Sequence, residues 1–360
     1  MKRIIDTCIK QPVSRVFYAS AENLNTLKTK GTTEMRVIYN DGLDPFFNLA
    51  AEEYLLENGA TDYFMVWRNA KSVIIGKNQN AYGEINAEFC EKNGISIVRR
   101  LTGGGAVFHD PGNVNFTFIT DAEEGESINF YPFMEKITAA LSEFGIEARA
   151  NGRNDIEADG FKISGNAQCV YNCRDGRKRL LHHGTLLFSA DMASLAGALN
   201  PKKEKLESKG IKSVRSRVAN ISKMEGYRGP DSAEEFACAL VEKCAEGAVT
   251  RITPEEAAAI GDMAERKYSA WEWNFGESPR FSDSAVARFP FGTVEITYTA
   301  RKGIIEEIKI QGDFFATGDI FLLERGLAGT SLEKKELLSA FSDVNKYIHG
   351  ASAEDIANMF

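Results

Sequence analysis

The sequence lacks any long apolar run, and this absence limits the classes of protein to which it can belong. No stretch of its 360 residues approaches the roughly 20 consecutive apolar residues that a membrane-spanning helix needs. The first residues, MKRIIDTCIKQPV, begin with positive charge, but Asp6 and Lys10 interrupt any apolar core, so we expect no secretory signal. A short basic presequence within residues 1–30 remains an alternative, because that segment holds few acidic residues. We expect a cytoplasmic protein that does not enter a membrane.

Cysteines are few, and acidic residues outnumber basic ones by 51 to 43. The 6 cysteines form no C-x-x-C pair and no zinc-like pattern with the 4 histidines, so we expect reduced thiols in the cytoplasm. The net charge of −8 argues against a general nucleic-acid binder, although a cleft can still be locally basic. The chain is 43% hydrophobic, which is enough for a large core, and its length suits about two domains.

Two helices with defined ends are predicted in the first half of the chain. Residues 44–59 carry apolar residues at helical spacing, with Asp44 as the N-cap, Pro45 in the first turn and Gly59 as the stop. Residues 129–146 form a second amphipathic pattern that ends at a glycine. Segments with strand patterns precede and separate these helices, so the chain is predicted to be α+β.

The pattern changes near residue 250. Two capping boxes, Ser232 to Glu235 and Thr253 to Glu256, begin helices on either side of this point. Residues 291–313 then alternate with period two about an RKG turn, which is typical of a β-hairpin. The predicted division is an N-terminal extension over 1–35 without an assigned role, a large α+β domain over 36–250 and a smaller α+β domain over 251–360.

The segment RRLTGGGAVFHD, residues 99–110, places three consecutive glycines after two arginines. Phosphate-binding glycine loops usually join a strand to a helix, whose N-terminus helps to bind the anion. Here no G-K-[ST] follows and position 108 is Phe, so both the P-loop and the dinucleotide fingerprint are excluded. The residues after the glycines have a strand pattern. A tight turn between two strands is therefore the ordinary interpretation.

Three features favour a binding loop over a simple turn. Three glycines remove side chains from a whole backbone stretch, which lets a ligand approach closely. Arg99 and Arg100 lie at the entry, and alternation along a strand sends one of them to each face, so that one can contact a phosphate. His109, His182 and His183 fall here or in LLHHGTLLF, although a structural role is the ordinary one for any single histidine.

A lysine in a later strand-like segment is a candidate for the catalytic positive charge. In DGFKISGNAQ, Phe161 and Ile163 point to one face of the strand, whereas Lys162 and Ser164 point to the other. A solvated lysine is the ordinary interpretation, but the small polar residues that follow suit the wall of an open site. There Lys162 would stabilise the negative charge that accumulates when a carboxylate attacks a phosphate.

Six motifs in this order carry a family resemblance: RRLTGGGAVFHD, NGRND, FKISGNAQ, HHGTLLF, NPKKEKLESKGIKSVRSRV and WEWNFG. The set resembles the lipoate–protein ligase A family of the biotin/lipoate protein ligase superfamily, over about nine-tenths of the chain from Met35. The resemblance implies an α+β fold, with a large mixed-sheet catalytic domain and a smaller C-terminal domain.

The resemblance also implies a reaction in two steps. ATP, with Mg²⁺, activates lipoate or octanoate to an acyl-adenylate, and the acyl group then passes to a lysine of an acceptor protein. The implied acceptors are lipoyl domains of 2-oxoacid dehydrogenase E2 subunits and the glycine-cleavage H protein. A monomer without nucleic-acid partners is expected.

Residues that match the motifs take implied roles. The implied ATP contacts are Arg100, Gly105, Ala106, Val107, Phe108, Asn154 and Lys162. The implied lipoate contacts are Arg99, Gly103, Gly104, His109, Lys162, His183 and Gly184, with Lys162 as the catalytic residue. Asp155 is the implied Mg²⁺ ligand, because a carboxylate suits a hard cation. The basic segment Pro201–Ser216 matches a loop that folds over the adenylate, although a charge run is ordinarily a solvated surface.

Alternative functions remain on the same scaffold. An octanoyltransferase takes its acyl group from a carrier protein without ATP, and some use a cysteine thioester, for which Cys169 and Cys173 are candidates. The C-terminal domain and the basic segment favour the ligase. A biotin ligase is disfavoured, because its arginine–glycine signature has no match. Arg100, Lys162 and Asp155 argue against a non-catalytic lipoate or lipoyl-protein binder.

Overall fold

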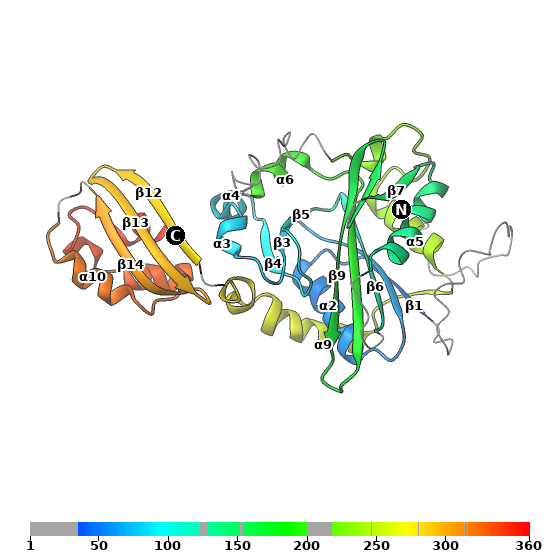
Figure 1. The fold of residues 1–360 in the computed structure, drawn as a ribbon, viewed down its shortest axis with the longest axis horizontal. Coiled ribbons are helices and arrows are strands. Elements are labelled where there is room, and N and C mark those ends of the chain that lie inside the picture. The colour runs from blue at the N-terminus through cyan, green and yellow to red at the C-terminus, as the bar shows by residue number, and fades with distance from the viewer. Residues whose placement is uncertain are drawn as a thin grey trace. The chain divides into compact units, whose positions relative to one another are not determined.

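The structure is a computed structural model that describes residues 35–122, 129–151, 154–199, 218–245, 247–279, 281–312, 314 and 316–360 (Figure 1). Its contacts form two compact units. Among the described residues, one unit comprises those up to Lys77 and from Ile85 to Tyr268, and the other comprises Asn78–Glu84 and those from Ser269 to Phe360. The basic segment Pro201–Ser216 and the N-terminal extension before Met35 lie outside the described residues. The division into domains at residue 250 stays a prediction.

An eight-stranded sheet forms the frame of the first unit, with strand order β11-β1-β2-β6-β10-β9-β8-β7. β1 pairs in parallel with β2 and β11, whereas the other neighbouring strands are antiparallel, so the sheet is mixed as the family resemblance implied. The strands are β1 (Arg36–Asn40), β2 (Tyr63–Arg68), β6 (Asn113–Asp121), β7 (Ala148–Asn151), β8 (Asp155–Ala158), β9 (Phe161–Asn172), β10 (Lys178–Leu187) and β11 (Val249–Thr250).

A three-stranded sheet and several helices complete this unit. The small sheet has the order β4-β3-β5, with β3 (Ser72–Ile75), β4 (Ser96–Arg99) and β5 (Val107–His109). The α-helices are α2 (Pro45–Asn58), α4 (Ala87–Lys92), α5 (Tyr131–Glu143), α6 (Met192–Ala198), α8 (Ala233–Cys244) and α9 (Pro254–Met263), and a π-helical turn, Ala264–Tyr268, follows α9. Residues 100–106, called the glycine loop below, therefore join β4 to β5, strand to strand, as the sequence predicted.

The two faces of the large sheet are covered by different elements. On one side α5 and α8 pack against a core that includes Phe64, Phe116 and Phe118. On the other side lie α2 and the small sheet (Figure 1). Because side chains alternate along a strand, Asn115 and Thr117 of β6 face this second side. The second side therefore receives polar residues from the same strands that bury aromatic rings on the first.

The second unit is a three-stranded antiparallel sheet covered by short helices. Its strands are β12 (Phe281–Phe289), β13 (Gly292–Arg301) and β14 (Ile304–Gly312), and its helices are α3 (Ala81–Glu84), α10 (Ile320–Leu327), α11 (Lys334–Ala340) and α12 (Ala353–Ala357), with a π-helical turn over Glu272–Gly276. The predicted hairpin is confirmed, because Lys302 and Gly303 connect β13 to β14 with φ angles of 52° and 70°. Two residues with positive φ are what a type I′ turn requires.

Local helix signals are confirmed at several ends. The Asp44 side chain accepts a hydrogen bond from the backbone N–H of Phe46 at the start of α2. Thr253 and Glu256 form both halves of the predicted capping box at α9. At α8, Ser232 accepts from the backbone N–H of Glu235, but no bond from the Ser232 N–H to the Glu235 side chain accompanies it among the described hydrogen bonds.

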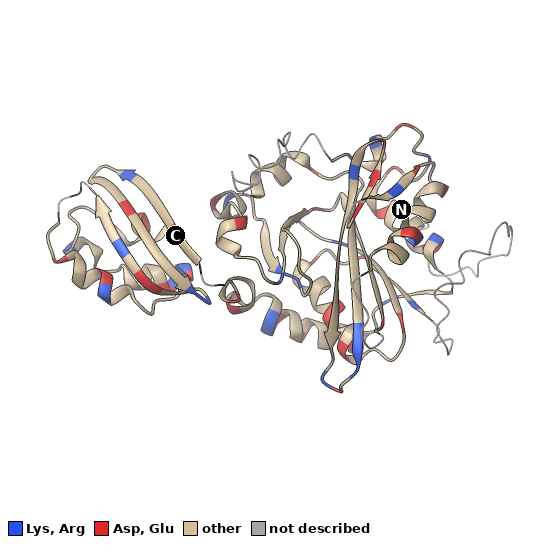
Figure 2. Cartoon of the chain, viewed as in Figure 1, with Lys and Arg blue, Asp and Glu red and all other residues tan. Residues whose placement is uncertain are grey.

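Two properties of the described residues bear on partners. None of the helices within these ranges is long and apolar enough to cross a membrane. Lys and Arg are interspersed with Asp and Glu along the described chain (Figure 2). A locally basic cleft would therefore depend on where single Lys or Arg side chains lie, and not on a broad basic surface.

Candidate functional site

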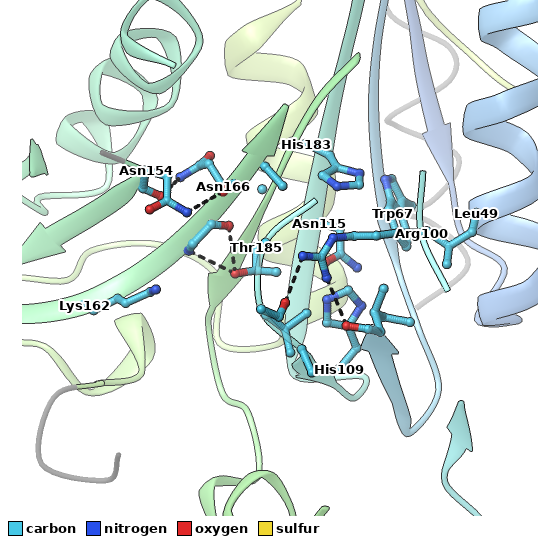
Figure 3. A pocket seen from close by; sticks show the side chains of 18 residues that line it. Leu49, Trp67, Arg100, His109, Asn115, Asn154, Lys162, Asn166, His183 and Thr185 are labelled. Carbon is cyan, nitrogen blue, oxygen red and sulfur yellow. Dashed lines mark hydrogen bonds between the residues drawn. The ribbon is translucent and has the colours of Figure 1, made fainter. Parts of the chain in front are cut away.

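A cavity of about 190 Å³ lies on the α2 side of the large sheet. Its lining comes from α2, β2, β3, the glycine loop, β5, β6, the turn before β8, β9 and β10. In the sheet, β9, β10, β6 and β2 are successive neighbours, so the cavity extends across strands rather than along one. Figure 3 shows Lys162 at one end of the set of lining side chains and Leu49 and Trp67 at the other.

Arg100 holds the glycine loop in shape. Its Nε donates to Thr102 Oγ1 at 3.0 Å, and its Nη1 donates to the carbonyl oxygen of Ile74 at 3.0 Å. Its Nη2 donates to the carbonyl oxygens of Gly103 and Gly105 at 2.7 and 2.8 Å. Burial lowers the pKa of Arg100 to about 10. Arg100 lines the cavity where an ATP contact was predicted, but four of its five N–H groups already bind the protein.

The three glycines have different roles in the loop. Gly104 has φ of 96°, in the region that glycine favours, and a Cβ on the neighbouring Gly76 would lie 2.1 Å from its carbonyl oxygen. A Cβ on Gly103 or Gly105 would meet open space. The backbone of Gly104, Gly105, Ala106 and Val107 lines the cavity. The loop therefore forms a wall made mostly of main chain.

Three of the predicted contacts do not line the cavity: Arg99, Gly103 and Phe108. Arg99 is fully buried, and its Nη1 donates to the carbonyl oxygens of Gly76 and Lys77 at 3.0 and 2.9 Å. Arg100 lines the cavity and Arg99 does not, but both guanidinium groups bind backbone oxygens of this protein.

Lys162 lines the end of the cavity opposite Leu49 and Trp67, and it forms an ion pair with Asp155, which does not line the cavity. Lys162 Nζ lies 2.7 Å from Asp155 Oδ1, and each side chain is about one-third exposed, at 36% and 33%. Among the described residues no group of three or more His, Cys, Asp or Glu side chains could hold a metal ion. A Mg²⁺ that arrives with nucleotide phosphates needs only one or two carboxylates, which Asp155 can supply.

Asn154 is held next to Lys162 by an exchange of hydrogen bonds with Asn166. Asn154 Nδ2 donates to the carbonyl oxygen of Asn166 at 2.7 Å, and Asn166 Nδ2 donates to that of Asn154 at 3.0 Å. Behind them, His182 Nε2 lies 3.2 Å from Asn166 Oδ1. A Cβ on Gly184 would lie 2.3 Å from the same oxygen, so glycine is needed there for packing. Asn154, Asn166 and Gly184 all line the cavity.

His183 joins the glycine loop to α2 through a buried network. Its Nδ1 lies 2.9 and 3.1 Å from the two carboxylate oxygens of Glu52, and its Nε2 lies 2.7 Å from Thr102 Oγ1. Thr117 Oγ1 donates to Glu52 at 2.6 Å, and Trp67 Nε1 donates to Thr117 at 2.8 Å. Every step of this network is buried, so its polar groups depend on one another for partners.

Sequence reasoning missed Glu52, Trp67 and Asn115. A weak signal for Glu52 was present, because it lies three residues after Leu49 and four before Leu56 and so belongs to the buried face of α2. Trp67 and Asn115 stand in strands with apolar patterns that gave no indication of a cavity.

His109 is the second histidine of the cavity, whereas His182 faces the other side of the sheet. His109 Nδ1 lies 3.1 Å from Asn69 Nδ2, and burial lowers the pKa of His109 to about 3. The His182 ring stacks on Phe133 with centroids 4.6 Å apart, and burial lowers its pKa to about 3 as well. Both imidazoles are therefore neutral near pH 7.

The two candidate thioester cysteines are poor nucleophiles. Burial raises the pKa of the Cys169 thiol to about 11 and also raises the pKa of the Cys173 thiol. Cys173 Sγ donates to the carbonyl oxygen of Leu56 at 3.3 Å. Neither residue lines the cavity. Both thiols are protonated near pH 7, whereas a nucleophilic cysteine must be a thiolate.

Comparisons with known proteins find relatives over most of the chain. Residues 44–245 match the family model described as the lipoyl protein ligase A/B catalytic domain, and this range contains every residue that lines the cavity. Residues 278–360 match the bacterial lipoate protein ligase C-terminus. Lipoate-protein ligase LplJ of Bacillus subtilis (strain 168) is 41% identical over 327 residues, which cover 88% of this chain and 96% of that protein.

Two solved structures are similar to the larger part of the chain. One is described as a bi-partite lipoate protein ligase and its E2 lipoyl domain from Thermoplasma acidophilum, with 29% identity, a TM-score of 0.59, and coverage of 68% of this chain and 97% of that one. The other is described as lipoate-protein ligase A bound with ATP, with 27% identity, a TM-score of 0.56, and coverage of 68% and 99%.

Proposed function

The chain belongs to the lipoate–protein ligase family, and from that premise we propose that it uses ATP to activate lipoate and transfers the lipoyl group to lysines of acceptor proteins. The observation that supports this proposal is the cavity, whose two ends differ in chemistry. Lys162 supplies positive charge at one end, and Leu49 and Trp67 supply apolar walls at the other. The first end suits a carboxylate beside a phosphate, and the second suits an acyl chain.

The first step joins the two substrates. An oxygen of the lipoate carboxylate attacks the α-phosphorus of ATP, the bond from that phosphorus to the bridging oxygen breaks, and pyrophosphate leaves. Lys162 carries three N–H donors, of which one binds Asp155 among the described residues. The remaining donors can hold a carboxylate and an α-phosphate oxygen together. Fixed positive charge at that point stabilises the transition state more than the ground state.

The glycine loop and Asn154 supply the rest of the nucleotide side. The backbone from Gly104 to Val107 lets phosphates approach closely, and Asn154 lies beside Lys162 on the facing wall. Asp155 would hold the Mg²⁺ that accompanies ATP, and that ion would neutralise phosphate charge. Because Asp155 binds Lys162, its carboxylate also orients the lysine ammonium group.

The second step needs little further chemistry from the enzyme. The ε-amine of an acceptor lysine attacks the acyl carbon of the adenylate, the bond from that carbon to the AMP oxygen breaks, and the amine loses a proton to solvent. The adenylate is already a good acyl donor, so the enzyme mainly holds the amine in place. No enzyme nucleophile is required, which agrees with the protonated thiols of Cys169 and Cys173.

We infer the acceptors by analogy. The Thermoplasma acidophilum structure is described together with an E2 lipoyl domain, which supports lipoyl domains of 2-oxoacid dehydrogenase E2 subunits as acceptors. The glycine-cleavage H protein is a second proposed acceptor. A cytoplasmic monomer, with a catalytic domain over 36–250 and an accessory domain over 251–360, completes the proposal.

Lipoate-dependent exchange of labelled pyrophosphate into ATP tests the proposed function. The isolated protein is expected to catalyse this exchange, because the first step is reversible. Absent exchange, together with acyl transfer from a carrier protein without ATP, would show an octanoyltransferase instead.

A double variant tests the thioester alternative separately. Replacing Cys169 and Cys173 together by Ser is expected to leave exchange and transfer to a lipoyl domain intact. Loss of transfer with retained exchange and an unchanged unfolding transition would contradict the direct attack of the acceptor amine.

A further inference from the structure

The end of the cavity remote from Lys162 presents two buried polar atoms without a hydrogen-bond partner among the described residues. They are His109 Nε2 and Asn115 Nδ2. His109 is 3% exposed and Asn115 is 1% exposed, and both line the cavity. Buried polar groups in native proteins are nearly always hydrogen-bonded, so two orphans at one cavity indicate that its occupant supplies the partner.

In the orientation that the structure gives the Asn115 amide, the unpartnered atom is the nitrogen, which is a donor. In the structure Asn115 Oδ1 accepts from Asn113 Nδ2 at 2.8 Å, and Asn113 Oδ1 is also without a partner among the described residues. The Asn115 Nδ2 group, with its two N–H bonds, is then turned away from Asn113.

His109 Nε2 is also a donor. Asn48 Nδ2 donates to Asn69 Oδ1 at 2.9 Å, so that Asn69 Nδ2 is the atom facing His109 Nδ1. Because Asn69 Nδ2 can only donate, His109 Nδ1 accepts. The proton of the neutral imidazole is therefore on Nε2.

Both donors border Trp67. Asn115 is paired across the sheet with Trp67 on β2 and with Thr185 on β10. The His109 ring meets the Trp67 ring edge-on, with centroids 6.2 Å apart. Asn115 is two strand spacings, about 10 Å, from β9, which carries Lys162. Leu49, Ile74 and Trp67 make the rest of this end apolar.

We propose that Asn115, supported by His109, is a specificity-determining residue that selects acyl chains whose far end carries hydrogen-bond acceptors. The inference rests on the proposed ligase function. With the carboxylate at Lys162, the dithiolane ring of lipoate reaches the Trp67 end and brings two sulfur atoms, which are weak acceptors. A hydrocarbon end, as in octanoate, brings none and leaves both donors buried and unsatisfied.

A pair of ligands of similar shape tests the proposal. Lipoate is compared with 5-cyclopentylpentanoate, in which CH₂ groups replace both sulfurs. Calorimetry on the full chain gives the two dissociation constants. Wild-type protein is expected to bind lipoate about ten-fold more tightly, which corresponds to ~1.4 kcal/mol.

Variants assign the selectivity to Asn115. Asn115→Leu removes the donor, and the ratio of the two dissociation constants is expected to fall about ten-fold. Asn115→Ser keeps a hydroxyl donor and is expected to retain part of the ratio. Ile74→Val is the control in the same cavity, because its lost methyl group weakens both ligands alike and leaves the ratio unchanged.

The possible outcomes separate the two proposals. A wild-type ratio near one, as expected if ordered water satisfied both donors, overturns the inference. Equal ratios in wild-type protein and Asn115→Leu overturn it as well. If the ratios of dissociation constants are as expected but pyrophosphate exchange is absent, the inference stands and the ligase chemistry is rejected. If exchange occurs but Asn115→Leu leaves the ratio unchanged, the ligase chemistry stands and the inference is rejected.

Discussion

The two faces of the large sheet bury different kinds of side chain, although the same strands build both. Toward α5 and α8 the sheet buries aromatic rings, such as Phe118 and Phe236. Toward α2 and the glycine loop it buries Glu52, Asn115 and His183, each of which depends on hydrogen bonds or a ligand. Apolar burial stabilises a fold without direction, whereas buried polar groups are stable only in one geometry. The first face therefore holds the sheet together, and the second holds the site.

Two adjacent histidines show the contrast at its smallest scale. His182 stacks on Phe133 and reaches the site only through Asn166. His183, one residue later, lines the cavity and binds Glu52. Mutations on the two faces should consequently separate stability from catalysis.

The largest change in stability is expected from Phe236→Ala, in α8 on the aromatic face of the large sheet. Phe236 is fully buried, with its ring stacked on Phe188 at 4.6 Å, so truncation should lower the free energy of unfolding by ~3–5 kcal/mol. Pyrophosphate exchange should persist at temperatures where the variant stays folded. Urea denaturation measures the first effect, with exposed Tyr131→Ala as the control within about 0.5 kcal/mol. A variant as stable as wild type would contradict the assigned core.

Lys162→Ala, in the cavity, should lower activity and leave stability nearly unchanged. The exchange rate is expected to fall by a factor of about 10²–10³, because one preorganised donor at the developing charge is lost. The free energy of unfolding should change by less than ~1 kcal/mol, since the ion pair with Asp155 is partly exposed. Lys178→Ala, an exposed lysine of β10, is the control for both measurements. Wild-type exchange in Lys162→Ala would remove this residue from the chemistry.

Glu52→Gln should lower both quantities, because Glu52 belongs to the cavity face and is also fully buried. The Gln amide would place N–H groups where the carboxylate now accepts from Thr117 and binds His183, at a cost of ~1–3 kcal/mol in unfolding free energy. Exchange should decrease as the Thr102 end of the loop loosens. Exposed Glu88→Gln serves as the control. A loss of stability without any loss of exchange would confine Glu52 to a structural role.

The smallest effect concerns pH and involves one histidine from each face. Burial lowers the pKa of His109 and of His182 to about 3, against ~6.5 in the unfolded chain. Between these pH values the unfolded state binds more protons than the folded state. The free energy of unfolding therefore includes the full contribution of both histidines above pH ~6.5 and loses it as the pH falls toward 3. His182→Phe keeps an aromatic ring against Phe133 and should reduce the pH slope by at most ~1.4 kcal/mol per pH unit. An unchanged slope in urea titrations from pH 4 to 7 would contradict this account.

Local sequence signals predicted the elements well. The cap at Asp44, the capping box at Thr253 and the hairpin at Lys302 depend on neighbouring residues, so the sequence contains all the information that they need. The strand after the three glycines was predicted in the same way, and it excluded the familiar phosphate loops. Hydrogen-bond partners across the sheet were not predictable by this route.

The two arginines illustrate that limit. Alternation predicted opposite faces, but it could not reveal that Arg100 would bind carbonyl oxygens of its own loop or that Arg99 would bind those of Gly76 and Lys77. The partnership of Glu52 with His183 depends on the register between β6 and β10 and on the packing of α2. The family resemblance assigned roles to motif residues and none to Glu52, Trp67 or Asn115.

The contact between Glu52 and His183 has a consequence for how the protein is made. Glu52 and His183 are 131 positions apart, and a ribosome adds ~5–20 residues per second. His183 is therefore synthesised on the order of ten seconds after Glu52. During that interval a nascent chain that packed α2 against β2 and β6 would bury Glu52 with Thr117 but without His183. We therefore expect this half of the sheet to close only after β10, which carries His183, has been synthesised.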